Sequence, residues 1–205
     1  MIKNVVFDIG NVLIRFDIDG ELLKAFGSDA EAKRMKPIIF SKYWHNCDLG
    51  VITLEEQIRC TCESSPKDSE SIIKMLSNRV DMFHPLKDSE NVVKELKNAG
   101  FGVYYNSNTS FDAIEGLSKK MGYLDVFDGG VISCAEKCLK ADEGRNLFHV
   151  FLEKYPLDPS ECVFIDDTLK NVESAQRAGF NTIHLETPEL LRSELKKFKE
   201  FKDIL

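Results

Sequence analysis

Four short apolar runs constrain the fold of this 205-residue chain more than any other feature. They are NVVFDI (4–9), GVYYN (102–106), GVISC (130–134) and CVFID (162–166), with a weaker fifth run, TIHL (182–185). Their apolar residues are continuous rather than alternating, which is typical of strands covered on both faces of a parallel sheet. Helical patterns at 88–100, 111–122, 141–155 and 171–179 separate the later runs. Strands that alternate with helices in this way predict a doubly wound α/β fold.

The long interval between the first and second runs breaks this alternation. From residue 16 to residue 86 we identify no convincing strand, whereas helical patterns cover 19–26, 29–40, 53–63 and 68–80. Ser28 and Thr53 precede two of these patterns and are typical N-caps. We therefore predict an α/β core domain formed by residues 1–15 and 87–205, and a small helical cap formed by residues 16–86. The alternative is an ordinary helical layer on one face of the sheet.

Composition and charge exclude several classes of protein. No apolar run approaches the ~20 residues that a membrane span needs, and the N-terminus lacks the basic stretch and apolar segment of a secretory signal. The net charge of −7 disfavours nucleic acid as a partner. The six cysteines form no paired C-x-x-C pattern, which favours reduced thiols. We expect a cytoplasmic protein, a monomer or a homodimer, with no nucleic-acid or membrane partner.

Polar side chains follow the predicted strands at the points where the strands end. They are Asp8, Ser107 and Asn108, Lys140, and the pair Asp166 and Asp167. Because ligands bind at the carboxyl ends of parallel strands, we expect these side chains to converge on one small volume. Clustered carboxylates repel one another unless a divalent cation holds them, and oxygen-only ligands favour Mg²⁺. In such a site Asp8 can attack a phosphate group, while a hydroxyl and a lysine stabilise its oxygens.

These motifs also carry a resemblance to the haloacid dehalogenase superfamily, over nearly the whole chain. VVFDIGNVL resembles the first motif of that family, VYYNSNT the second, SCAEKCLKAD the third and VFIDDTLKNVESAQRAG the fourth. The resemblance implies a Rossmann-like core with a small C1-type cap. It also implies that Asp8 is the nucleophile. Phosphate contacts would come from Ser107, Asn108 and Lys140, and a Mg²⁺ site would be formed by Asp8, the carbonyl of Gly10, Asp166 and Asp167. Ala141 departs from the pattern, because many relatives have proline after the lysine.

Gly10 is the more consequential departure. Most phosphatases of this family have a second aspartate two residues after the nucleophile, which protonates the leaving oxygen and then activates water. Loss of such a group typically lowers the rate by about 10²–10⁴-fold. Three explanations are open: a cap or loop residue (Asp17, Asp19 or His45) substitutes, the substrate has a leaving group that needs little protonation, or the protein is a weak or inactive relative that binds phosphorylated ligands.

A narrower resemblance supports the second explanation. The form F-D-[IL]-G-N-V is similar to a bacterial branch that includes glucose-1-phosphate phosphatases, and HNCDLGVITLEEQ (45–57) resembles the cap pattern of that branch. The cluster KYWHNC is suited to covering a sugar ring, which makes His45 a candidate substrate contact, but it suits a cap core equally well. Dehalogenases of the superfamily also lack the second aspartate, yet the pair Asp166 and Asp167 favours phosphate chemistry. We predict a Mg²⁺-dependent phosphatase acting on a small phosphorylated metabolite such as a sugar phosphate, in particular a sugar 1-phosphate.

Overall fold

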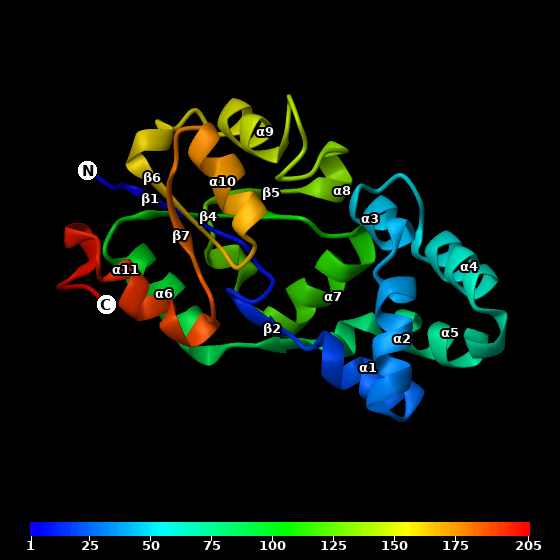
Figure 1. Ribbon diagram of the computed structural model, residues 1–205. Helices are drawn as coiled ribbons and strands as arrows, with labels where there is room; N and C mark the ends of the chain where they lie inside the picture. The colour runs from blue at the N-terminus through cyan, green and yellow to red at the C-terminus, as the bar shows by residue number, and fades with distance from the viewer.

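The computed structural model describes residues 1–205 and confirms the predicted α/β fold. Five parallel strands form the central sheet in the order β5-β4-β1-β6-β7 (Figure 1). The strands are β1 (Asn4–Phe7), β4 (Gly102–Ser107), β5 (Gly129–Ile132), β6 (Cys162–Asp166) and β7 (Asn181–His184). Because the chain builds outward from β1 to β5 and then returns to add β6 on the other side of β1, the carboxyl ends of β1, β4 and β6 meet at the switch point where such folds bind ligands.

Both faces of the sheet are covered, which explains the continuous apolar runs. Successive side chains of a strand point to opposite faces, and in β1 Val5 and Phe7 join one buried cluster while Val6 joins the other. Helices α9 (Leu147–Lys154) and α10 (Leu169–Arg177) pack with Val6. Helices α6 (Lys87–Asn98), α7 (Phe111–Met121) and α11 (Leu191–Leu195) cover the opposite face.

Five helices from the segment between β1 and β4 gather to one side of the sheet, at the right of Figure 1. They are α1 (Ile18–Phe26), α2 (Asp29–Ile39), α3 (Lys42–Asp48), α4 (Leu54–Ser64) and α5 (Ser69–Ser77). Ser28 caps α2 and Thr53 caps α4, as predicted. Met35 and Leu76 of these helices belong to the same buried cluster as Val5 of β1. These helices therefore pack against the α/β part through one continuous core.

The structure differs from the sequence-based expectations in several segments. Two strands of three residues, β2 (Ile14–Phe16) and β3 (Phe83–Pro85), pair antiparallel where the chain enters and leaves the helical segment, so the expectation of no strand there was wrong for β3. Helix α9 begins only at Leu147, because Asn146 is its N-cap and Gly144 has a φ of 76°. The end of the run predicted over 130–134 instead starts the short helix α8 (Ser133–Glu136).

Single 3₁₀ turns complete the fold: Pro66–Asp68, Arg79–Met82, Leu124–Val126, Pro159–Glu161, Pro188–Leu190 and Lys199–Phe201. All six cysteines are free thiols, and Cys162 is buried in the core. None of the helices combines the length and the apolar character needed to cross a membrane.

Candidate active site

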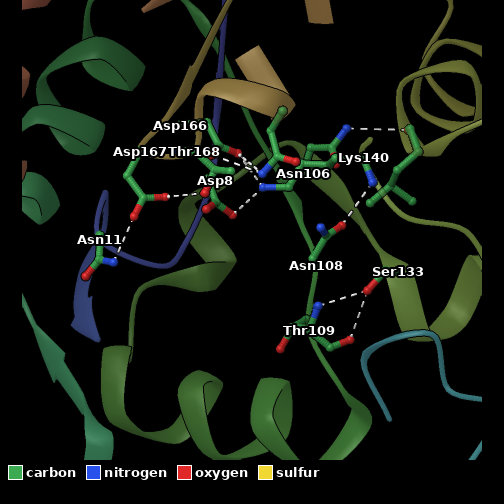
Figure 2. A network of polar contacts seen from close by, with 12 residues as sticks. Asp8, Asn11, Asn106, Asn108, Thr109, Ser133, Lys140, Asp166, Asp167 and Thr168 are labelled. Atoms are coloured by element: carbon green, nitrogen blue, oxygen red, sulfur yellow. Dashed lines mark hydrogen bonds and ion pairs between the residues drawn. The ribbon is translucent and has the colours of Figure 1, made fainter. Parts of the chain in front are cut away.

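Three charged side chains from separate segments form a buried cluster at one edge of the sheet (Figure 2). Asp8 directly follows β1, Asp166 is the last residue of β6, and Lys140 lies in the loop after α8. The Lys140 Nζ atom is 2.8 Å from Asp8 Oδ1 and 2.5 Å from Asp166 Oδ2. Lys140 is only 1% exposed and Asp166 is fully buried. One ammonium group thus bridges carboxylates that follow or end two neighbouring strands, at the edge where the sequence predicted these side chains to converge.

Burial and charge set the protonation of this cluster. Burial raises the pKa of Asp8 to about 7, and the neighbouring Lys140 opposes that rise only in part. Burial alone would lower the pKa of Lys140, but the carboxylates of Asp166 and Asp8 outweigh it and the pKa is raised. Lys140 therefore keeps its charge at neutral pH. A further positive charge near Asp8 would favour its ionised form.

A third carboxylate completes a group that fits a divalent cation. One oxygen each from Asp8, Asp166 and Asp167 can be chosen so that all lie within 4.8 Å of one another. Neighbouring donors hold Asp166, which accepts from the Thr168 backbone N–H at 2.8 Å and from Asn171 Nδ2 at 3.1 Å. A small set of oxygen ligands at one sheet edge suits Mg²⁺, which completes its shell with water and substrate oxygens.

Asn11 contributes to this site and was not among the predicted residues. Its Nδ2 atom donates to Asp167 Oδ2 at 2.9 Å, and its Oδ1 atom accepts from the Phe16 backbone N–H at 3.0 Å. Its φ of 51° lies in the left-handed region, which asparagine tolerates better than most residues. The Gly10-Asn11 pair at a turn was the available signal. Asn11 therefore connects the turn after β1 to Asp167, directly after β6.

The loop after β4 supplies the candidate phosphate contacts. Ser107 is buried, and Asn108 Oδ1 accepts from the Lys140 backbone N–H at 3.0 Å. The next residue, Thr109, donates its backbone N–H to Ser133 Oγ at 2.9 Å. The structure thus brings Ser107, Asn108 and Lys140 to the same edge, and the contacts of Asn108 and Thr109 hold the loops after β4 and β5 together (Figure 2).

A cavity of about 120 Å³ lies between this edge and the helices of the 16–86 segment. The sheet side of its lining includes Gly10, Ser107 and Asn108, and helix α3 contributes Trp44 and Asp48. The remaining lining residues, mostly apolar, are Ile9, Ile14, Phe16, Phe83, Thr109, Ala113 and Leu117. A Cβ atom added to Gly10 would have Asp8 Oδ2, at 3.9 Å, as its nearest neighbour. The cavity therefore leaves room for a side chain at position 10.

The residues considered as substitutes for a missing acid do not line this cavity. Asp17 caps α1 by accepting from the Gly20 backbone N–H at 3.0 Å. Asp19 forms an ion pair with Lys36, and the Asp19 side chain is 80% exposed. His45 is exposed, although Trp44 beside it faces the cavity. Asp48 does line the cavity; only its place in the cap pattern HNCDLGVITLEEQ pointed to it.

Several known proteins are similar to this chain. The family model described as haloacid dehalogenase-like hydrolase matches residues 2–179. The sesquiterpene phosphatase astK of Aspergillus oryzae is 24% identical over 183 residues, which cover 89% of each chain. The bifunctional riboflavin kinase/FMN phosphatase of Arabidopsis thaliana is 23% identical over 83% of this chain, but the match spans only 47% of that longer protein.

Solved structures share the fold. The enzyme bt-2542 of Bacteroides thetaiotaomicron, in complex with magnesium and inorganic phosphate, is 23% identical and superimposes with a TM-score of 0.67, covering 89% of this chain and 93% of that one. The L-2-haloacid dehalogenase of Xanthobacter autotrophicus is 18% identical with a TM-score of 0.64, covering 89% of this chain and 76% of that one.

Proposed function

The chain belongs to the haloacid dehalogenase-like hydrolase family, and from this membership we propose that it is a Mg²⁺-dependent phosphatase acting on a small phosphorylated metabolite. The observation that carries the proposal is the buried cluster in which Lys140 bridges Asp8 and Asp166, with Asp167 beside them. Retention of all three carboxylates favours phosphate over halide chemistry. Two relatives whose names describe phosphatases support the same choice.

In the proposed reaction Asp8 attacks the phosphorus atom of a monoester, and water later hydrolyses the aspartyl-phosphate. Lys140 neutralises charge on the phosphoryl oxygens, while Ser107 and Asn108 bind those oxygens and orient the group. A Mg²⁺ ion held by Asp8, Asp166, Asp167 and the Gly10 carbonyl would supply the positive charge that lets a carboxylate approach a phosphate dianion. His45, being exposed, contacts only a substrate that extends out of the cavity.

The lining of the cavity suggests two substrate classes. The aromatic rings of Trp44, Phe16 and Phe83 can stack on a sugar ring, which fits the sugar 1-phosphate hypothesis. The same largely apolar lining also fits an alkyl or prenyl monophosphate, the class suggested by the name of the fungal relative. The anomeric oxygen of a sugar 1-phosphate leaves more easily than an ordinary alkoxide, which compensates for the absence of an acid at Gly10. The oxygen of a prenyl phosphate leaves phosphorus no more easily than that of another alkyl ester, so a prenyl substrate would still need a proton donor.

We expect Mg²⁺-dependent release of inorganic phosphate from at least one of these classes. The test is a panel of sugar 1-phosphates, matching sugar 6-phosphates, prenyl and acyl phosphates and nucleotides, each with Mg²⁺ and with excess chelator. Faster turnover of sugar 1-phosphates than of the 6-phosphates supports the sugar 1-phosphate hypothesis. Faster turnover of prenyl phosphates than of either would instead favour a prenyl monophosphate as the substrate. The proposal is contradicted if no compound of the panel releases phosphate, or if the protein releases halide from a 2-haloacid without Mg²⁺.

A further inference from the structure

We propose that Asp48, the last residue of α3, is the general acid and base of this active site and takes the role that Gly10 leaves open. The inference rests on the proposed phosphatase function. Asp48 is the one carboxylate among the residues that line the 120 Å³ cavity, and it lies there together with Gly10, Ser107 and Asn108. Gly10 connects this cavity to Asp8, since a Cβ atom at position 10 would lie 3.9 Å from Asp8 Oδ2. A leaving group that occupies the cavity while its phosphate is at Asp8 would therefore meet Asp48 as the one carboxylate of the cavity wall.

Contacts between the α3 end and the α/β part hold Asp48 at this place. Ser133 Oγ donates to the Asp48 carbonyl at 2.6 Å, and the same Ser133 accepts from the Thr109 backbone N–H. Lys137 Nζ donates to the Gly50 carbonyl. Gly50 has a φ of 62°, and a Cβ atom there would collide with the Cys134 carbonyl. The segment 48–50 is thereby docked on α8, and Ser133 links it through Thr109 to the loop after β4, which carries Asn108.

The groups around Asp48 set its pKa in the range that acid/base catalysis needs. Burial raises the pKa of Asp48 to about 7, and the positive charge of Arg79 and a hydrogen bond from Trp44 limit the rise. The titratable or charged groups that face it are Arg79, Asp112, Cys47 and Cys134, with Lys137 on the adjoining turn. An acid/base group works best when its pKa lies near the operating pH. Asp48 meets that condition.

Asp8 Oδ forms a bond to phosphorus, the bond from phosphorus to the ester oxygen breaks, and that oxygen takes the proton of the Asp48 carboxyl and leaves as an alcohol. Water then attacks the phosphorus of the aspartyl-phosphate and gives a proton to the Asp48 carboxylate. The bond between phosphorus and Asp8 breaks, inorganic phosphate leaves, and both side chains return to their first states.

The test is the dependence of kcat/KM on the leaving group, since this constant covers the steps up to release of the alcohol. For phenyl phosphate, whose phenol has a pKa of about 10, we expect Asp48→Asn to lower kcat/KM by about 10²-fold. For para-nitrophenyl phosphate, which needs no proton to leave, the expected loss is below about tenfold. Asp29→Asn, which neutralises an exposed acid of α2 outside the cavity, should match the wild type on both.

The variant's remaining activity on para-nitrophenyl phosphate also shows that it is folded. Equal losses on both esters, or none on either, overturn the role of Asp48 while leaving the phosphatase proposal intact. Absence of turnover by the wild-type protein overturns both. A pH profile at saturating Mg²⁺, whose charge would keep Asp8 ionised, adds a second readout: the acid must be protonated, so wild-type kcat/KM for phenyl phosphate should fall as the pH rises through about 7. Asp48→Asn should lack that fall.

A carboxyl group introduced at position 10 should restore the activity that Asp48→Asn loses. Gly10 has no positive φ and there is room for a side chain, so Gly10→Asp can place a carboxyl group beside Asp8. We expect Gly10→Asp to raise kcat/KM for phenyl phosphate at least about tenfold more in the Asp48→Asn background than in the wild-type background, where the role is filled. A gain of the same size in both backgrounds would show that Asp48 does not occupy the role.

Discussion

Asp8→Asn is expected to lower the rate of phosphate release by about 10⁵-fold, which is the size of rate loss typical when a catalytic nucleophile is removed. Asparagine keeps the shape of the side chain, and its oxygen can still accept from Lys140, which retains Asp166 as its ion-pair partner. The variant removes one of three mutually repelling carboxylates. We therefore expect the folded state to be at least as stable as in the wild type, so that the loss of activity is chemical.

Two measurements separate this result from a structural defect. Steady-state phosphate release gives the rate, and acid quenching followed by mass spectrometry detects the phosphoryl group on the wild-type chain and its absence in the variant. Thermal unfolding checks the fold, and Asp29→Asn provides a matched change of an exposed acid. Residual turnover above about 1% of the wild-type rate, with the phosphoryl group still attached elsewhere, would remove Asp8 from the role of nucleophile.

The parts of the structure that local sequence determines were predictable. Strands buried on both faces must be apolar throughout, and therefore β1, β4 and β6 were found within a few residues of their ends. Because parallel strands point the same way, the predicted convergence of Asp8, Lys140 and Asp166 at one edge follows from the fold class alone. N-caps such as Ser28 and Thr53 act through contacts three residues away, so they too are visible locally.

The parts that depend on tertiary packing were not predictable from this pattern. Strands β2 and β3 have three residues each, too few to show a periodicity. They form because the segments where the chain enters and leaves the helices of residues 16–86 lie side by side. Helix α3 is short and carries aromatic residues on more than one side. Asp48 resembles any acid at a helix end until contacts with Ser133 and Lys137 place its segment over the sheet edge. The chemistry of position 10 can therefore be judged only with the helices of segment 16–86 in place.

Arg79 is the residue that most directly joins those helices to the α/β part. It lies in the 3₁₀ turn after α5, is 1% exposed, and donates to both carboxylate oxygens of Asp112 on α7. It also donates to Gln57 Oε1 at 3.2 Å on α4 and lies 5.5 Å from the ring centroid of Trp44 on α3. One buried guanidinium thus contacts α3, α4 and α7. Removing it leaves Asp112 without its cation and Gln57 without a donor.

Arg79→Leu is therefore expected to lower the free energy of unfolding by about 2 kcal/mol, because it leaves the buried Gln57 Oε1 without a donor and Asp112, whose side chain is 34% exposed, without its cation. Urea unfolding followed by circular dichroism measures the change. The matched control is Arg59→Leu, which removes an exposed ion pair with Glu63 on the same set of helices and should leave the midpoint unchanged. Adding Asp112→Leu to Arg79→Leu should recover part of the loss, since no unpaired charge then remains. If both arginine variants shift the midpoint equally, the Arg79 network does not join the helices, and the position of Asp48 depends on Ser133 and Lys137 alone.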